Sequence, residues 1–130
     1  MKFIIDSANI EAIERLLALG FVSGITTNPS ILKLEEKPRL EQVDRLLEFE
    51  DEDIYVQLVG LNVEDMYHDF LTLKDMYEKE LKRFIFKIPI NRVGLKVIKK
   101  INDKDPSLRI LGTTIYTFNQ ALAGIMAGCE

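Results

Sequence analysis

The sequence predicts an α/β fold in which parallel strands alternate with helices. Short apolar runs rich in β-branched and aromatic residues alternate along the chain with longer segments of helical period. The units repeat at intervals of roughly 20–30 residues, which leaves room for a crossover helix between one strand and the next parallel strand. The chain has 130 residues, of which 47% are hydrophobic, so it can bury a core. We expect one domain covering residues 1–130.

Five segments carry the strand signal. Each is a short apolar run bounded by turn-forming, acidic or glycine residues. Pro29 ends the second run, because a residue that precedes proline disfavours the helical region. The expected strands are residues 2–6, 21–26, 54–59, 84–90 and 109–113.

Helical periodicity fills the intervals between these strands. Gly20 follows the first periodic segment, where a helix C-terminus favours glycine. Thr117 and Gln120 have the spacing of a capping box, which predicts the start of the last helix. The expected helices are residues 10–17, 40–47, 63–81 and 93–101, and a final helix after Thr117.

Polar residues stand where a buried parallel sheet should be apolar. Both faces of an open doubly wound sheet are covered by helices, so its strands are almost wholly apolar. Lys87 and Gln57 nevertheless interrupt two of the apolar runs. The C-terminal ends of parallel strands form the edge where ligands bind. Further polar residues lie at such ends: Asp6, Thr26, Thr27, Asn28, Thr113 and Thr114.

Two architectures use this order of elements. A flavodoxin-like open sheet is complete with five units, whereas a (β/α)₈ barrel of about 200–250 residues is not. A barrel explains the polar side chains better, because its strands also face a central cavity. The sequence therefore favours an α/β fold of the parallel (β/α) TIM-barrel type, truncated after about five β/α units. A flavodoxin-like binding domain is the alternative.

Lys87 is the residue most informative about chemistry. A desolvated lysine lowers its pKa, and the neutral amine is a nucleophile that forms a Schiff base with a carbonyl substrate. The alternative is a lysine that reaches water or protects an edge strand. Structural roles are equally open for the other residues: Asp6 as a helix cap, 26–30 as a turn, and Gln57 as a satisfied core amide.

Composition excludes several classes of function. The formal net charge of −4 argues against nucleic acid as the main partner. Cys129 and His68 are the only cysteine and histidine, so a disulfide within the chain and a metal site built from these residue types are excluded. We expect His68 at the surface and Cys129 to be a bystander. No apolar run approaches the roughly 18 residues of a membrane span, and we expect a cytoplasmic protein with no metal and no membrane partner.

Several segments together resemble the transaldolase family, in particular its short bacterial branch that includes fructose-6-phosphate aldolase. They occur in the family's order and at similar spacing along the whole chain. The most specific are the Gly-Ile-Thr-Thr-Asn-Pro-Ser segment and a Lys-Ile-Pro segment on the fourth strand. The matching stretches are residues 3–8, 24–31, 56–58, 86–89 and 111–116.

The resemblance implies a role for each matching residue. Lys87 would form a Schiff base with the keto carbon of a sugar phosphate, and a dihydroxyacetone unit would remain as a nucleophilic enamine after carbon–carbon cleavage. No metal or organic cofactor is implied. The other implied roles are proton transfer for Asp6, holding the catalytic water for Gln57, a hydrogen bond to that water for Thr113, and binding of substrate hydroxyls for Thr26 and Asn28.

The chain departs from the family pattern at its C-terminal end. The family barrel has three more strands. In the aldolase branch the sixth strand supplies a tyrosine for proton transfer, and the arginine and serine that hold the substrate phosphate come from beyond the fifth helix. We expect either a fragment of a longer protein or a chain that associates with another copy, as a homo-oligomer, to cover its apolar inner wall. The alternative function is a truncated, catalytically inactive family member that acts as an oligomeric or binding protein.

Overall fold

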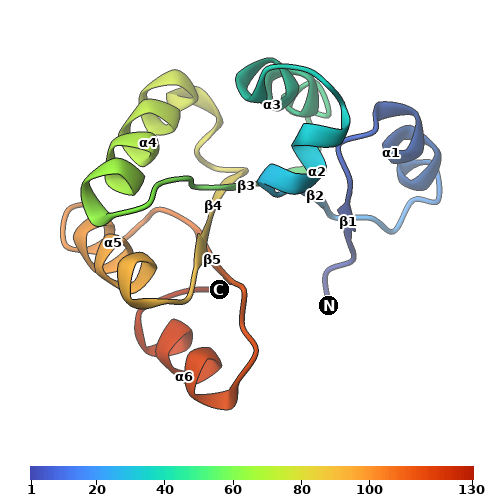
Figure 1. Ribbon diagram of the computed structural model, residues 1–130. Helices are drawn as coiled ribbons and strands as arrows, with labels where there is room; N and C mark the ends of the chain where they lie inside the picture. The colour runs from blue at the N-terminus through green and yellow to red at the C-terminus, as the bar shows by residue number, and fades with distance from the viewer. The chain divides into compact units, whose positions relative to one another are not determined.

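A computed structural model describes residues 1–130 as strands that alternate with helices (Figure 1). The strands are β1 (Ile4–Asp6), β2 (Gly24–Thr26), β3 (Asp53–Gln57), β4 (Phe84–Pro89) and β5 (Ile110–Thr113). The helices are α1 (Ile10–Leu17), α2 (Pro29–Leu34), α3 (Arg39–Leu47), α4 (Val63–Met76), α5 (Arg92–Asn102) and α6 (Phe118–Met126), with a 3₁₀ turn, η1, at Glu78–Glu80.

The strands follow one another in the sheet in sequence order, β1-β2-β3-β4-β5. The pairs β1–β2, β2–β3 and β4–β5 are parallel. The predicted parallel α/β class is confirmed. A flavodoxin-like sheet places its second strand outside the first, so the sequential order, which is that of a (β/α) barrel, rules out the flavodoxin-like alternative.

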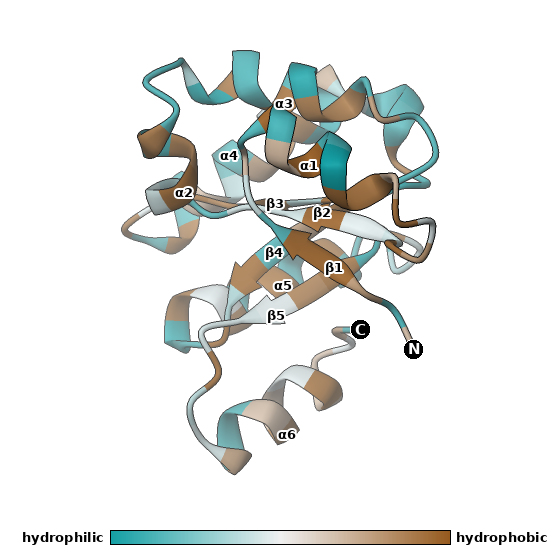
Figure 2. Cartoon of the chain, turned by 90° about the vertical axis from the view of Figure 1, so that its right-hand side faces the viewer, coloured by the Kyte–Doolittle hydropathy of each residue, from teal (hydrophilic) through white to brown (hydrophobic).

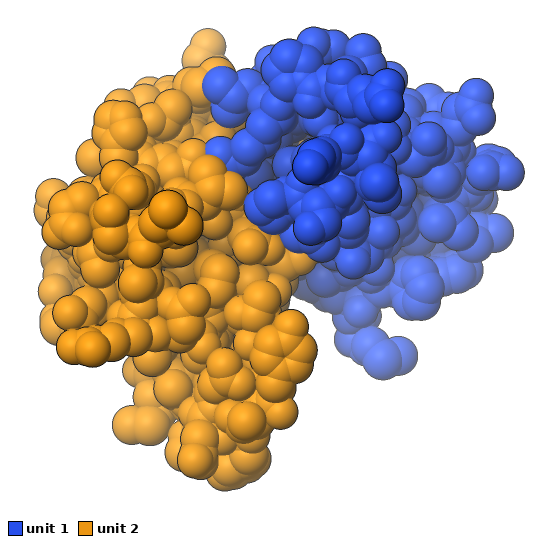
Figure 3. All heavy atoms as spheres, viewed as in Figure 1, with its two compact units in different colours: residues 1–56 blue, residues 57–130 orange.

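The chain consists of two compact units, residues 1–56 and 57–130, which are described separately below (Figure 3). The expectation of one domain over 1–130 stays a prediction.

The first unit buries one face of its strands against helices. Ile5 pairs with Ile25 and Ile25 with Ile54, so these three side chains share a face. All three are buried, together with Ile13 of α1 and Val43 of α3. Figure 2 shows the apolar character of β1 and the polar turns of the helix surfaces. The short strands therefore owe their stability to this shared apolar face.

The second unit packs aromatic rings between β4 and α4. The ring of Phe86 lies edge-on to that of Phe70 in α4, with centroids 5.0 Å apart. Phe84 stacks on Tyr77, just beyond the end of α4, with centroids 5.2 Å apart. Phe84, Phe86 and Ile88 alternate along β4 and are fully buried. The even-numbered side chains of β4 thus form its helix-facing side.

The structure differs from the sequence prediction at two helices. No helix is predicted between residues 17 and 40, whereas α2 begins at Pro29, separated from the end of β2 by two residues. Asn28 is its N-cap and accepts a hydrogen bond from Ile31 N at 3.0 Å. Proline fits the first helical position, where its missing N–H has no intrahelical partner. The helix predicted for 63–81 ends at Met76, since Tyr77 leaves the helical region at φ −114° and ψ 30°.

Candidate functional site

Asp6 and Thr26 lie side by side at the C-terminal ends of β1 and β2. They are Cα partners in the parallel register, so their side chains share the face opposite the buried isoleucines. Asp6 is exposed and Thr26 is half-buried. The ladder continues one step past the strands, where Ser7 N donates to Thr26 O at 3.1 Å. The first unit therefore brings two of the predicted site residues together at one edge.

Tyr55 is a residue on this face that the sequence analysis missed. It pairs with Thr26 in the register and is only 2% exposed. A Cβ on Gly24 would lie 2.8 Å from Asp53 O and 3.0 Å from the Tyr55 ring, so glycine leaves space for both. Tyr55 lies two residues before Gln57, and side chains two residues apart on a strand share a face. This spacing is the signal by which the sequence could have identified Tyr55. Its backbone carbonyl accepts from Thr27 N at 3.2 Å and from Thr27 Oγ1 at 3.4 Å, so Thr27 fixes the short link between β2 and α2.

Asn28 follows Thr27 in this link and has a structural role of its own. Its Oδ1 caps α2, so its Nδ2 group is the part available to donate to a ligand. Asn28 is half-buried at the start of the helix. The predicted binding role and the observed capping role therefore use different atoms of one side chain.

Lys87 is buried in the middle of β4, with 8% of its surface exposed. Its neighbours Phe86 and Ile88 point towards the helices, so Lys87 lies on the opposite face of the strand. It pairs with Leu111 of β5, and Pro89 pairs with Thr113. Lys87 and Thr113 therefore share a face, with Thr113 one step nearer the C-terminal edge.

Gln57 reaches the same face from β3. Leu58 N donates to Lys87 O at 2.9 Å. Between β4 and β5, Phe86 N donates to Arg109 O, and Phe86 pairs with Ile110, the residue after the acceptor. By the same rule Leu58 pairs with Ile88, the residue after Lys87. The same geometry places Gln57 beside Lys87. The second unit thus brings together Gln57, Lys87 and Thr113, all three predicted from the sequence.

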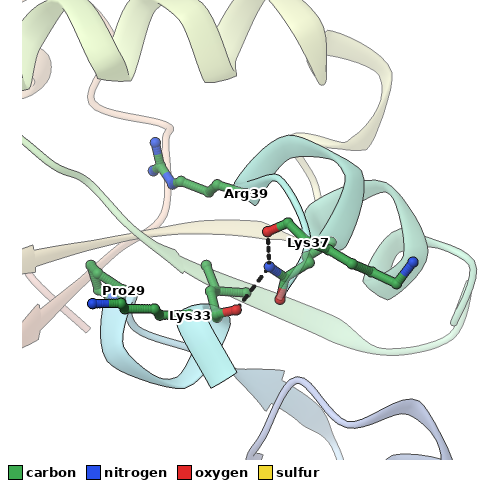
Figure 4. Close-up of a pocket in the computed structure, with 6 residues that line it drawn as sticks. Pro29, Lys33, Lys37 and Arg39 are labelled. Carbon is green, nitrogen blue, oxygen red and sulfur yellow. Dashed lines mark hydrogen bonds between the residues drawn. The ribbon is translucent and has the colours of Figure 1, made fainter. Parts of the chain in front are cut away.

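A separate pocket of about 240 Å³ lies between α2 and α3 in the first unit (Figure 4). Gln42 holds its wall, because its Nε2 donates to Leu32 O at 2.8 Å and to Lys37 O at 2.6 Å. The side chains of Lys33 and Lys37 run in opposite directions, and Lys37 pairs with Glu41 at 3.1 Å. No predicted site residue lines this pocket.

Two titratable groups outside these sites have a raised pKa with a local cause. Burial, followed by repulsion from Asp51 and then Asp53, raises the pKa of Glu52. Burial raises the pKa of the Cys129 thiol, which disfavours the reactive thiolate. His68 is exposed, as predicted.

The structure contains no cluster of three acidic, histidine or cysteine side chains able to hold a metal ion. None of its helices has the length and apolar character needed to cross a bilayer.

Comparison with known proteins agrees with this arrangement. A family model described as transaldolase/fructose-6-phosphate aldolase matches residues 3–130. A probable transaldolase of Methanococcus maripaludis (strain C5 / ATCC BAA-1333) is 31% identical over 130 residues, which is 100% of this chain and 58% of the relative. A probable transaldolase of Clostridioides difficile (strain 630) is 33% identical over 128 residues, 98% of this chain and 56% of the relative.

A third relative, the probable transaldolase of Thermodesulfovibrio yellowstonii (strain ATCC 51303 / DSM 11347 / YP87), is 30% identical over 128 residues, which is 98% of this chain and 57% of the relative. The chain therefore spans between 56% and 58% of the length of these three curated relatives. Because the family model covers nearly every residue, this chain belongs to the transaldolase/fructose-6-phosphate aldolase family.

Proposed function

We propose that the chain supplies the Schiff-base lysine of a class I aldolase or transaldolase that acts on ketose phosphates and transfers or releases a dihydroxyacetone unit. One observation carries this proposal. Lys87 is buried at 8% exposure in an otherwise apolar strand, on a face that it shares with Gln57 and Thr113. Burial disfavours the charged ammonium form, and the neutral amine is the nucleophile that attacks a ketone.

The proposed chemistry begins with addition of the Lys87 amine to the keto carbon of the substrate. Loss of water from the resulting carbinolamine forms a protonated imine. A base then takes the proton of the hydroxyl on the carbon β to the iminium, and the bond between the α and β carbons breaks. Its electron pair forms the enamine double bond, and the β carbon leaves as an aldehyde. The enamine either attacks an acceptor aldehyde, which completes transfer, or takes up a proton. Hydrolysis of the imine then releases the product and regenerates the amine.

The other predicted site residues have proposed supporting roles in this chemistry. Gln57, beside Lys87, positions the water that is lost and regained, and Thr113 donates or accepts a hydrogen bond to it. Asp6 is the carboxylate proposed for proton transfer. Thr26 and the Nδ2 group of Asn28 bind substrate hydroxyls. Such groups accelerate the reaction by orientation and by proton transfer in the transition state.

Borohydride trapping tests the proposal directly. The protein is incubated with fructose 6-phosphate or with dihydroxyacetone, reduced with borohydride and analysed by peptide mass spectrometry. We expect a reduced adduct on Lys87 that requires the ketone. Lys87→Met should abolish it, whereas Lys96→Met, which removes an exposed lysine of α5, should leave it intact.

A longer family member labelled in parallel is the control for the reagents. Absence of an adduct on Lys87, while that control is labelled, overturns the proposal for this chain and favours an inactive family member with a binding role. The homo-oligomeric state and the cytoplasmic location predicted from the sequence stay predictions.

A further inference from the structure

Gln120 connects three segments of the second unit through one side chain. Its Nε2 donates to Ile90 O, just past the end of β4, at 3.0 Å, and to Thr114 O at 3.4 Å. Its Oε1 accepts from Tyr116 N at 2.9 Å, from Thr117 N at 3.1 Å and from Thr117 Oγ1 at 3.3 Å. A capping box needs only the contacts with Thr117. The bonds to Ile90 and Thr114 therefore do more than begin α6.

The bond to Ile90 bears on the position of Thr113. Ile90 N donates to Thr113 O at 2.9 Å, while Ile90 O accepts from Gln120. The peptide units on both sides of Ile90 thus link the end of β4 to β5 and to α6. Since Lys87 lies three residues before Ile90, the same bonds set where the β4 and β5 ends lie relative to the lysine.

Thr114 shows that the loop after β5 is held against a local preference. Its φ is +55°, in the left-handed region, which a β-branched residue rarely adopts. Such a conformation persists only where the surroundings over-determine it. Thr114 Oγ1 donates to Thr113 O at 2.8 Å, and Gln120 holds Thr114 O. Thr113 ends β5, and the next residue, Thr114, keeps its strained backbone conformation with the help of the hydrogen bond from Gln120.

We propose that Gln120 is a positioning residue that fixes Thr113 and the end of β4 for the reaction at Lys87. The inference rests on the proposed function, since it assigns Gln120 a part in that chemistry. Gln120 acts through backbone carbonyls and amides. Its loss should slow imine formation without weakening the encounter with the ketone, because misplacement of a reacting group by about 1 Å costs up to about 100-fold in rate.

Two substitutions separate the two halves of the side chain. Gln120→Glu keeps an oxygen that accepts from Tyr116 N and Thr117 N, but it loses the donor to Ile90 O and Thr114 O. Gln120→Met has a similar volume and loses all of these bonds. Asn119→Ala, at the exposed neighbouring position of α6, is the matched control.

The measurement is the rate of Lys87 labelling with dihydroxyacetone and cyanoborohydride at increasing ketone concentration. We expect the maximal rate to fall about tenfold or more in Gln120→Met and to fall in Gln120→Glu, with the half-saturating concentration unchanged. Loss of folded protein lowers the final amount of labelled Lys87, whereas misplacement lowers the rate constant, so the two effects separate. Asn119→Ala should match the wild type.

The outcomes distinguish this inference from the function on which it rests. If the wild type is labelled and both Gln120 variants are labelled at its rate, the positioning role is wrong and the Schiff-base function stands. If the variants lose only final amplitude, Gln120 is purely structural and the inference is again overturned. If Lys87 of the wild type is not labelled at all, the proposed function fails and this inference fails with it.

Discussion

Gly94 permits the close approach of α5 to β4, and Gly94→Ala tests that packing. An ideal Cβ at this position would lie 1.8 Å from Pro89 O and 3.1 Å from Ile88 Cγ2. The carbonyl would have to move by about 1.6 Å to reach the 3.4 Å of ordinary van der Waals contact. It belongs to the backbone of the strand that carries Lys87, and it also accepts from Asn91 N at 2.9 Å. No side-chain rotation relieves such a contact.

The magnitude follows from two opposing effects. Overpacking a well-packed interior costs about 1–3 kcal/mol, and a backbone obstacle places this site at the upper end. Alanine in place of glycine in a helix returns at most about 1 kcal/mol. We therefore expect Gly94→Ala to lower the free energy of unfolding by about 2 kcal/mol or more. For a chain of this size, that corresponds to a melting temperature lower by roughly 6–10 °C.

Urea denaturation and thermal melting measure this loss, and Gly124→Ala is the matched control. Gly124 lies within α6, where an added Cβ would meet Ile90 Cδ1 at an ordinary 3.4 Å. That variant should be neutral or gain up to about 1 kcal/mol from helix propensity. A Gly94→Ala protein within about 0.5 kcal/mol of the wild type would refute the close approach of α5 to β4.

Three further substitutions test individual contacts. Asn28→Ala removes the cap oxygen of α2 and should cost about 1 kcal/mol in urea denaturation, whereas Asn28→Asp keeps that oxygen, so equal losses would contradict the capping role. Gln42→Met removes one buried and one partly buried hydrogen bond and should cost about 2 kcal/mol in the same assay; an unchanged midpoint would show that the carbonyls find other donors. Ser107→Ala removes the hydrogen bond that is the main cause of the lowered pKa of Asp105, so carboxyl NMR should show that pKa rising. A carboxyl group whose pKa is lowered by folding stabilises the folded state at every pH above its ordinary pKa. The stability lost in Ser107→Ala should therefore be seen at neutral pH and should vanish as the pH falls through the folded pKa. A loss that persists in acid would refute this cause.

The sequence predicts elements well where a single physical pattern decides them. Lys87 stands out because six apolar residues surround it between 84 and 90, and the strand there is confirmed. The capping box of Thr117 and Gln120 is also confirmed. Its spacing alone provides hydrogen-bond partners for the free backbone N–H groups at the start of the helix. In α2, by contrast, Asn-Pro begins a helix as readily as it forms a turn, and six residues are too few to show a period.

Tertiary contacts decide the features that the sequence does not predict. Met66, Phe70, Leu73 and Tyr77 recur at helical spacing and are all buried, so periodicity favours a longer helix than the one that forms. The helix ends there while the Tyr77 ring stacks on Phe84 of the following strand. A long-range contact likewise decides the role of Gln120 at the candidate site. Its spacing from Thr117 predicts a cap, but its bond to Ile90 O spans 30 residues of sequence. Local spacing therefore identifies which side chains can carry chemistry, whereas the contacts that position them appear only once β4 and β5 lie side by side.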